Sequence, residues 1–134
     1  MLDTNVIAYA VSKAPEDADK NVKAIDLIAN TRFGLSAQVL QEFYVTTTRR
    51  LRVPLSHDQA LDWIESLEEF PCVPIDASLV YQGAERAHRY QISYWDGAIV
   101  AAAERLGVET LYTEDLNHGQ FYGAVRAINP FHQH

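Results

Sequence analysis

The sequence has a single cysteine and no apolar run long enough to cross a membrane. Cys72 cannot form an internal disulfide, and no pair of cysteines is spaced for zinc. A membrane helix needs about 20 predominantly apolar residues in a row, which the chain does not contain. The acidic Asp3 stands where a secretory signal would carry basic residues. We therefore expect a cytoplasmic protein without a membrane segment.

Lysines and phosphate-binding glycine motifs are also scarce. The three lysines lie near the start of the chain, at Lys13, Lys20 and Lys23. No G-x-x-x-x-G-K motif occurs, which excludes a P-loop nucleotide binder. A phosphate-accepting receiver domain needs a lysine after a late strand, and none is present there.

Acids outnumber lysines and arginines by 18 to 11, and the net charge of the 134 residues is −7. Nucleic-acid binders usually carry a basic surface, so the balance by itself argues against that class of partner. A bound divalent cation compensates the negative charge of the acids around it, so those acids no longer repel nucleic acid. The charge therefore leaves open a metal-dependent enzyme that acts on nucleic acid.

Strand and helix signals alternate along the chain without a repeat or a linker, which predicts one domain over residues 1–134. Short apolar or β-rich runs predict strands at residues 33–36, 72–75, 108–113 and 125–129, and residues 2–7 predict a very short strand with its exit. Helical spacing predicts helices at residues 16–29, 37–51, 55–67, 76–90 and 94–106. The expected N-caps are Ser36, Ser56 and Asp76, and the expected stop of the last helix is Gly107. This alternation predicts an α/β fold of parallel strands joined by helices.

Four acids are candidates for one site, because ligands of such sheets bind beyond the carboxyl ends of the strands. Asp3 and Asp115 follow predicted strands, and Asp96 begins a predicted helix. Glu42 lies inside a predicted helix, on a face that is not obviously polar. Each acid has a structural alternative: a turn for Asp3, a helix edge for Glu42, a helix cap for Asp96 and a loop for Asp115.

Carboxylates packed together repel one another and raise each other's pKa unless a cation lies among them. Oxygen ligands without thiolates or a positioned histidine suit Mg²⁺ or Mn²⁺ rather than zinc. Such a site lowers the pKa of a bound water and shields the charge of a phosphate, as phosphodiester hydrolysis requires. Glu114, the neighbour of Asp115, is expected at the rim of this site or in a weaker role.

Several segments together resemble the PIN-domain nucleases, and within them the VapC-type toxins of bacterial toxin–antitoxin pairs. They are DTNVIAYA at residues 3–10, LSAQVLQEFYV at 35–45, ISYWDGAIVAAAERLG at 92–107, LYTEDLNHGQ at 111–120 and INPF at 128–131. The four acids, at positions 3, 42, 96 and 115, follow one another at separations of 39, 54 and 19. The resemblance implies a three-layer α/β/α fold with a central, mostly parallel sheet. Only two residues precede Asp3, where the family has several more, so it also implies a shortened first strand.

The resemblance further implies a Mg²⁺- or Mn²⁺-dependent endoribonuclease. One or two metal ions would be held by Asp3, Glu42, Asp96 and Asp115, with Asn5, Ser36 and Thr113 as the polar supports that orient carboxylates or waters. It also implies single-stranded RNA as substrate, a homodimer, and an antitoxin whose tail enters the acidic groove. The alternative is a non-catalytic PIN-like module that binds RNA or protein, which would explain the fold but not the presence of all four acids.

Arginines and aromatic residues near the acids are candidates for contacts with RNA. The arginines are Arg49, Arg50 and Arg52, whose alternative role is to complement the dipole at a helix C-terminus. Tyr94 and Trp95 could stack a base, although aromatic residues beside a buried helix are more often part of the core. Of the histidines, a substrate contact is considered for His118, whereas exposure is expected for His132 and His134.

Overall fold

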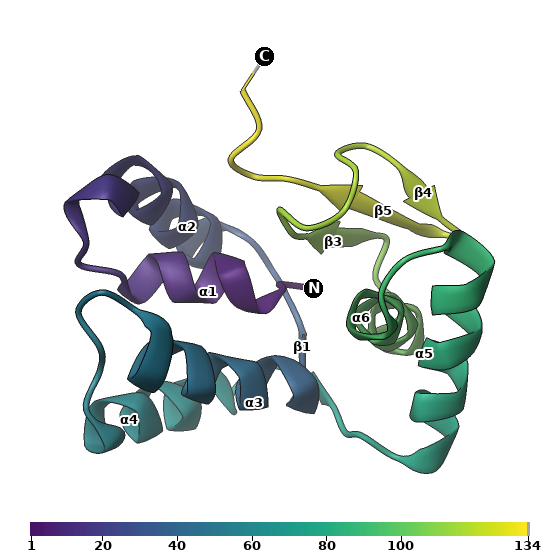
Figure 1. The fold of residues 1–134 in the computed structure, drawn as a ribbon, viewed down its shortest axis with the longest axis horizontal. Coiled ribbons are helices and arrows are strands. Elements are labelled where there is room, and N and C mark those ends of the chain that lie inside the picture. The colour runs from purple at the N-terminus through teal and green to yellow at the C-terminus, as the bar shows by residue number, and fades with distance from the viewer. Residues whose placement is uncertain (134) are drawn as a thin grey trace.

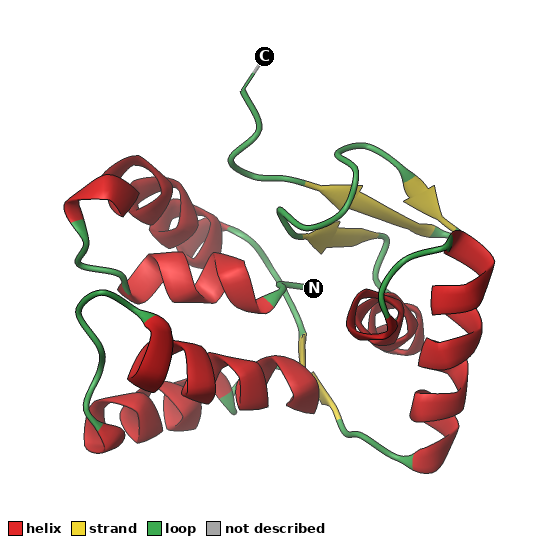
Figure 2. Cartoon of the chain, in the orientation of Figure 1, coloured by secondary structure: helices red, strands yellow, loops and turns green. Residues whose placement is uncertain are grey.

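Short strands separate pairs of helices along the chain, and three strands follow the last pair (Figures 1 and 2). The computed structural model describes residues 1–133, and His134 lies outside the described residues. The helices are α1 (Thr4–Val11), α2 (Ala18–Asn30), α3 (Ala37–Val45), α4 (His57–Leu67), α5 (Ala77–Tyr90) and α6 (Tyr94–Leu106), with a 3₁₀ turn η1 (Pro15–Asp17) and a π-helical turn η2 (Thr46–Arg50). The strands are β1 (Leu35–Ser36), β2 (Cys72–Val73), β3 (Thr110–Tyr112), β4 (Phe121–Tyr122) and β5 (Val125–Ile128). Over residues 1–133, no helix combines the length and the apolar character that crossing a membrane requires.

The first three residues connect the two halves of the sheet. In one half, β1 pairs with β2 in parallel; in the other, β5 lies between parallel β3 and antiparallel β4. Between the halves, the Asp3 amide donates to the Tyr112 carbonyl and the Tyr112 amide to the Met1 carbonyl, both at 2.9 Å. On the other side, the Leu2 amide donates to the Gly34 carbonyl at 3.2 Å. Residues 1–3 therefore act as a very short central strand that places Asp3 at its carboxyl end.

The layers are those expected of the α/β/α architecture. In Figure 1, α1 to α4 gather on one side of the N-terminal segment and β1, whereas α5 and α6 lie on the other side. All strand pairs are parallel except β4 with β5. The predicted three-layer fold with a mostly parallel sheet is confirmed.

Residues 2–7, predicted as a very short strand with its exit, differ from the prediction beyond residue 3, because a helix begins at Thr4. The Asp3 side chain accepts a hydrogen bond from the Thr4 amide at 2.7 Å and so occupies the first free donor of α1. The helix is buried on most of its circumference, including the adjacent pair Val6 and Ile7. A helix that is apolar all round has no amphipathic period, so its sequence resembles a buried strand.

Two further differences concern element ends. The helix predicted over residues 37–51 is α-helical only to Val45 and continues as the π-helical turn η2. Strand β4 was not predicted, since two residues are too few to show an alternating pattern.

The predicted helix caps are confirmed. Ser36 and Asp76 accept hydrogen bonds from amides three residues ahead, and Ser56 forms a reciprocal capping box with Gln59. Gly107 ends α6 in the left-handed conformation, with φ of 79°. Of these signals, Ser36 determines where α3, the helix that carries Glu42, begins.

Helices α5 and α6 approach closely because glycine lies at their contact. A Cβ at Gly83 would lie 2.9 Å from the Cα of Ala98, and a Cβ at Gly97 would lie 2.5 Å from the Gly83 carbonyl oxygen. Both distances are too short for a side chain without movement of backbone. This contact fixes the first turn of α6, which carries Asp96.

We expect Gly83→Ala to lower the free energy of unfolding by about 2 kcal/mol, although alanine favours helix by about 1 kcal/mol relative to glycine. The reason is overpacking against the backbone of α6. Urea unfolding followed by circular dichroism measures the change. The control is Ser78→Ala at an exposed position of α5, which should change stability by less than about 0.5 kcal/mol. Equal stability of the two variants would contradict the expected clash.

Candidate functional site

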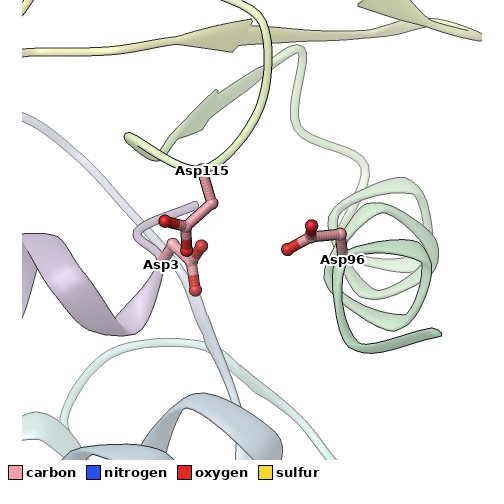
Figure 3. A group of neighbouring side chains, drawn as sticks. All are labelled: Asp3, Asp96 and Asp115. Atoms are coloured by element: carbon pink, nitrogen blue, oxygen red, sulfur yellow. The ribbon is translucent and has the colours of Figure 1, made fainter. Parts of the chain in front are cut away.

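Three aspartates from distant parts of the chain meet at the carboxyl edge of the sheet. Asp3 follows the central strand, Asp96 lies in the first turn of α6, and Asp115 follows β3. Each offers one carboxylate oxygen, and these oxygens lie within 4.8 Å of one another. Figure 3 shows the Asp96 carboxylate pointing from α6 toward the other two. Three of the four predicted acids therefore converge.

Asp3 is the most constrained of the three, with 5% of its surface exposed. One carboxylate oxygen accepts from the Thr4 amide at 2.7 Å, and the other accepts from the Thr113 hydroxyl at 2.8 Å. The Thr113 hydroxyl oxygen also accepts from the Asp115 amide at 3.1 Å. Thr113 thus connects two of the aspartates, which is a supporting position of the kind predicted for it.

Asn5 supports Asp115 from helix α1. Its side-chain amide donates to the Asp115 carboxylate at 3.0 Å. Its Oδ1 is buried and has no hydrogen-bond partner within residues 1–133. An unpaired buried oxygen is uncommon and costly, so this atom offers an acceptor beside the aspartates for a bound water.

Glu114 lies outside the group of three aspartates. Its carboxylate accepts from the Tyr9 hydroxyl at 2.7 Å and forms an ion pair with Lys20 at 2.8 Å. Lys20 also lies 4.6 Å from the centre of the Tyr9 ring. These contacts anchor the loop after β3 to α1 and α2. Glu114 therefore binds Tyr9 and Lys20, whereas Asp115 lies beside Asp3 and Asp96.

Glu42 lines the same pocket but is engaged by two other side chains. Its carboxylate accepts from the Thr4 hydroxyl at 3.1 Å and from the Gln38 amide at 2.7 Å. Gln38 is buried and also donates to the Trp95 carbonyl at 3.3 Å, which connects α3 to α6. Ser36 caps α3 and so fixes the helix that carries Glu42. Neither Thr4 nor Gln38 was predicted, although the four-residue spacing of Gln38 and Glu42 is a recognisable signal.

The aspartates disfavour one another's charge. Burial, followed by the charges of Asp115 and Glu42, raises the pKa of Asp3 from 3.8 to about 7 against the opposing effect of its hydrogen bonds. Burial is also the main cause that raises the pKa of Asp96 and of Asp115, with neighbouring carboxylates adding to it. A cation among them would remove this penalty.

The residues present fit a hard divalent cation. They surround a pocket of about 530 Å³, and its lining contains neither cysteine nor histidine. Its members are Asp3, Gln38, Gln41, Glu42, Val45, Thr46, Arg50, Trp95, Asp96, Ile99 and Asp115. A donor set of carboxylate oxygens suits Mg²⁺ or Mn²⁺.

The predicted RNA-contact residues separate in the structure. Arg50 lines the pocket, Arg49 is exposed elsewhere, and Arg52 forms an ion pair with Glu16 at 2.8 Å. Of the two alternatives for Trp95, the core position is wrong, since 64% of its surface is exposed and it lines the pocket, and base stacking stays a prediction.

His118 lies in the loop between β3 and β4, outside the lining of the pocket. Its ring accepts a hydrogen bond from the Asn129 amide at 3.0 Å and stacks on His132, with 4.0 Å between ring centres. His132 is exposed, as predicted.

Comparisons with known proteins agree with this architecture. The family model of the PIN domain matches residues 1–123. The crystal structure of Mycobacterium tuberculosis VapC20, a toxin that cleaves the sarcin–ricin loop, is similar with a TM-score of 0.67 and 21% identity over 85% of this chain and 88% of that one. The structure of FitAB bound to the IR36 DNA fragment gives a TM-score of 0.71 and 24% identity over 99% of this chain and 96% of that one. No curated protein matches in sequence.

Proposed function

This chain belongs to the PIN-domain family, and from that premise we propose that it is a Mg²⁺- or Mn²⁺-dependent endoribonuclease. The observation that carries the proposal is the convergence of three aspartate carboxylates within 4.8 Å in a pocket open to a ligand. A buried acid whose pKa is raised by burial and by like charges is typical of functional sites. PIN domains are generally nucleases, which agrees with this chemistry.

Asp3, Asp96 and Asp115 would hold the cation, and Glu42 would lie at the wall of the same pocket. A bound divalent cation supplies a lowered water pKa and compensates the charge of the scissile phosphate. Thr113 and Asn5 keep the carboxylates of Asp3 and Asp115 in place through their hydrogen bonds. The fourth acid, Glu42, accepts hydrogen bonds from Thr4 and Gln38 and would orient a water molecule in the same pocket.

The proposal extends to partners and location. VapC20, whose fold this chain shares, is a toxin, so we infer that this chain is the toxin of a toxin–antitoxin pair. It would act on single-stranded RNA, form a homodimer and be inhibited by an antitoxin segment entering the acidic pocket. A cytoplasmic location belongs to the same proposal, since RNA and a reducing environment for the free thiol of Cys72 occur there together.

The purified protein should cleave single-stranded RNA in Mg²⁺ or Mn²⁺ and lose this activity in excess chelator. Cleavage is followed on denaturing gels with a set of labelled RNAs, and activity should return when the metal is restored. Asp96→Asn protein prepared in parallel controls for contaminating nucleases. Absence of cleavage by the folded protein with either metal would overturn the proposal and favour a non-catalytic binding module.

A further inference from the structure

The helical segment that carries Glu42 ends in a rare geometry beside the pocket. In η2 the Leu51 amide donates to the Thr46 carbonyl at 3.1 Å, five residues back. Buried Thr47 donates its hydroxyl to the Phe43 carbonyl at 2.7 Å, and such contacts often bend helices. Single π-helical turns are uncommon and frequently lie at functional sites.

Of the two arginines in this turn, Arg50 lines the pocket. Arg50 lies four residues after Thr46 and five after Val45, and all three line the pocket. Arg49 is not among the lining residues. Arg49 and Arg50 are adjacent, exposed and chemically identical, so position alone distinguishes them.

Arg50 introduces a positive charge into a pocket whose other charged residues are acids. Within residues 1–133 it forms no ion pair, whereas nearby Arg52 is paired with Glu16. A guanidinium group presents a planar set of donors that matches the oxygens of a phosphate. Arg50 therefore gives this pocket a group suited to an anionic ligand.

Trp95 provides an exposed aromatic surface in the same pocket. It directly precedes Asp96, and 64% of its surface is exposed although the α6 residues from Gly97 to Ala103 are buried. The Gln38 side-chain amide donates a hydrogen bond to the Trp95 backbone carbonyl at 3.3 Å. The Tyr94 ring lies nearly perpendicular to the Trp95 indole, with 5.1 Å between ring centres. A large indole held at a pocket mouth is suited to stack on a flat apolar partner.

We propose that Arg50 and Trp95 form a nucleotide subsite for single-stranded nucleic acid. Trp95 stacks on one unpaired base, and Arg50 binds a backbone phosphate next to the one that the aspartates face. A base within a duplex is covered on both faces by its neighbours, so the subsite selects single strands. The inference rests on the proposed function, because it places a nucleotide beside the phosphodiester to be cut.

The test is binding of a fluorescent single-stranded RNA of about 8 nucleotides, measured by anisotropy. Ca²⁺ replaces Mg²⁺, and a gel confirms that the RNA stays intact. We expect Trp95→Ala to weaken binding about tenfold and Trp95→Phe to weaken it less than about threefold, since phenylalanine keeps an aromatic face. Trp95→Leu, which is apolar without a π surface, should behave like Trp95→Ala. The matched duplex should bind all four proteins equally weakly.

The two adjacent arginines give a matched pair for the phosphate contact. Arg50→Ala should weaken binding about fivefold and reduce the slope of log affinity against log salt by about 0.7, the value for one phosphate on a single strand. Arg49→Ala, which removes the same charge one residue away, should change affinity less than twofold, a difference of about 0.4 kcal/mol.

Wild-type affinity in Trp95→Ala and Arg50→Ala, equal effects of Arg49→Ala and Arg50→Ala, or no binding by the wild type would each overturn the subsite. The proposed hydrolysis is judged separately from cleavage in Mg²⁺ or Mn²⁺. Binding that falls as expected in a protein that cuts no RNA supports the subsite and rejects the nuclease. Cleavage without any effect of these substitutions on binding rejects the subsite alone.

Discussion

Asp96→Asn should reduce the rate of RNA cleavage in Mg²⁺ by roughly 100- to 1000-fold, which corresponds to about 3–4 kcal/mol of transition-state stabilisation. The substitution removes one of three negative charges around the cation and leaves the volume of the side chain unchanged. The cap of α6 should survive, because the Ser93 hydroxyl accepts from the backbone amide of Asp96 and not from its side chain. The rate is measured with saturating RNA in excess metal.

The control is Asp62→Asn, which makes the same chemical change on exposed helix α4, away from the pocket. It should cleave RNA at the wild-type rate. Melting curves of both variants should show folded protein, so that a lost rate reports on chemistry. Cleavage by Asp96→Asn at the wild-type rate would remove Asp96 from the proposed catalytic group.

Mg²⁺ should stabilise the wild-type protein by roughly 3 kcal/mol when present at about 100 times its dissociation constant, and Asp3→Asn should remove most of this gain. In the absence of metal, Asp3→Asn should be the more stable of the two proteins: at about pH 8 its free energy of unfolding should exceed that of the wild type by on the order of 2–4 kcal/mol. Asparagine keeps an oxygen that can cap α1 but carries no charge into the buried position. Thermal unfolding with and without chelator measures both effects.

The pH dependence follows from the direction of the Asp3 shift. Because its pKa in the folded chain is raised from 3.8 to about 7, the neutral acid is the form that folding favours. That stability is fully present below about pH 4 and is lost as the pH rises through about 7, after which the folded chain buries a charge. The metal-free wild type should therefore lose stability over this range relative to Asp3→Asn. Parallel pH profiles of the two proteins would contradict the assigned burial of the charge.

The three aspartates are the part of the site that the sequence predicts best. Each lies at a strand end or at a helix start, and those local positions share one edge in a parallel sheet. The contacts of Glu42 are not predictable in the same way. They depend on Thr4, which donates a hydrogen bond to Glu42 from α1. The sequence of α1 resembles a buried strand, because nearly all sides of this helix are buried.

Other features depend on contacts between residues far apart in sequence. The carboxylate of Glu114 is directed by Tyr9 and Lys20, which lie on two helices near the start of the chain. Nothing in the segment around Glu114 indicates those partners. The π-helical turn that ends in Arg50 likewise has no local signal, since it depends on how the end of α3 packs.

The central strand also constrains when the pocket can form during synthesis. The hydrogen bond between Asp3 and Thr113 joins residues 110 positions apart. Ribosomes add about 5–20 residues per second, so the first aspartate waits several seconds or longer for its partners. Until β3 leaves the exit tunnel, the segment from Met1 to Asp3 has no neighbour on one side, and Asp115 does not yet exist beside it. A nascent chain therefore carries no completed acidic pocket while most of its own message is being translated.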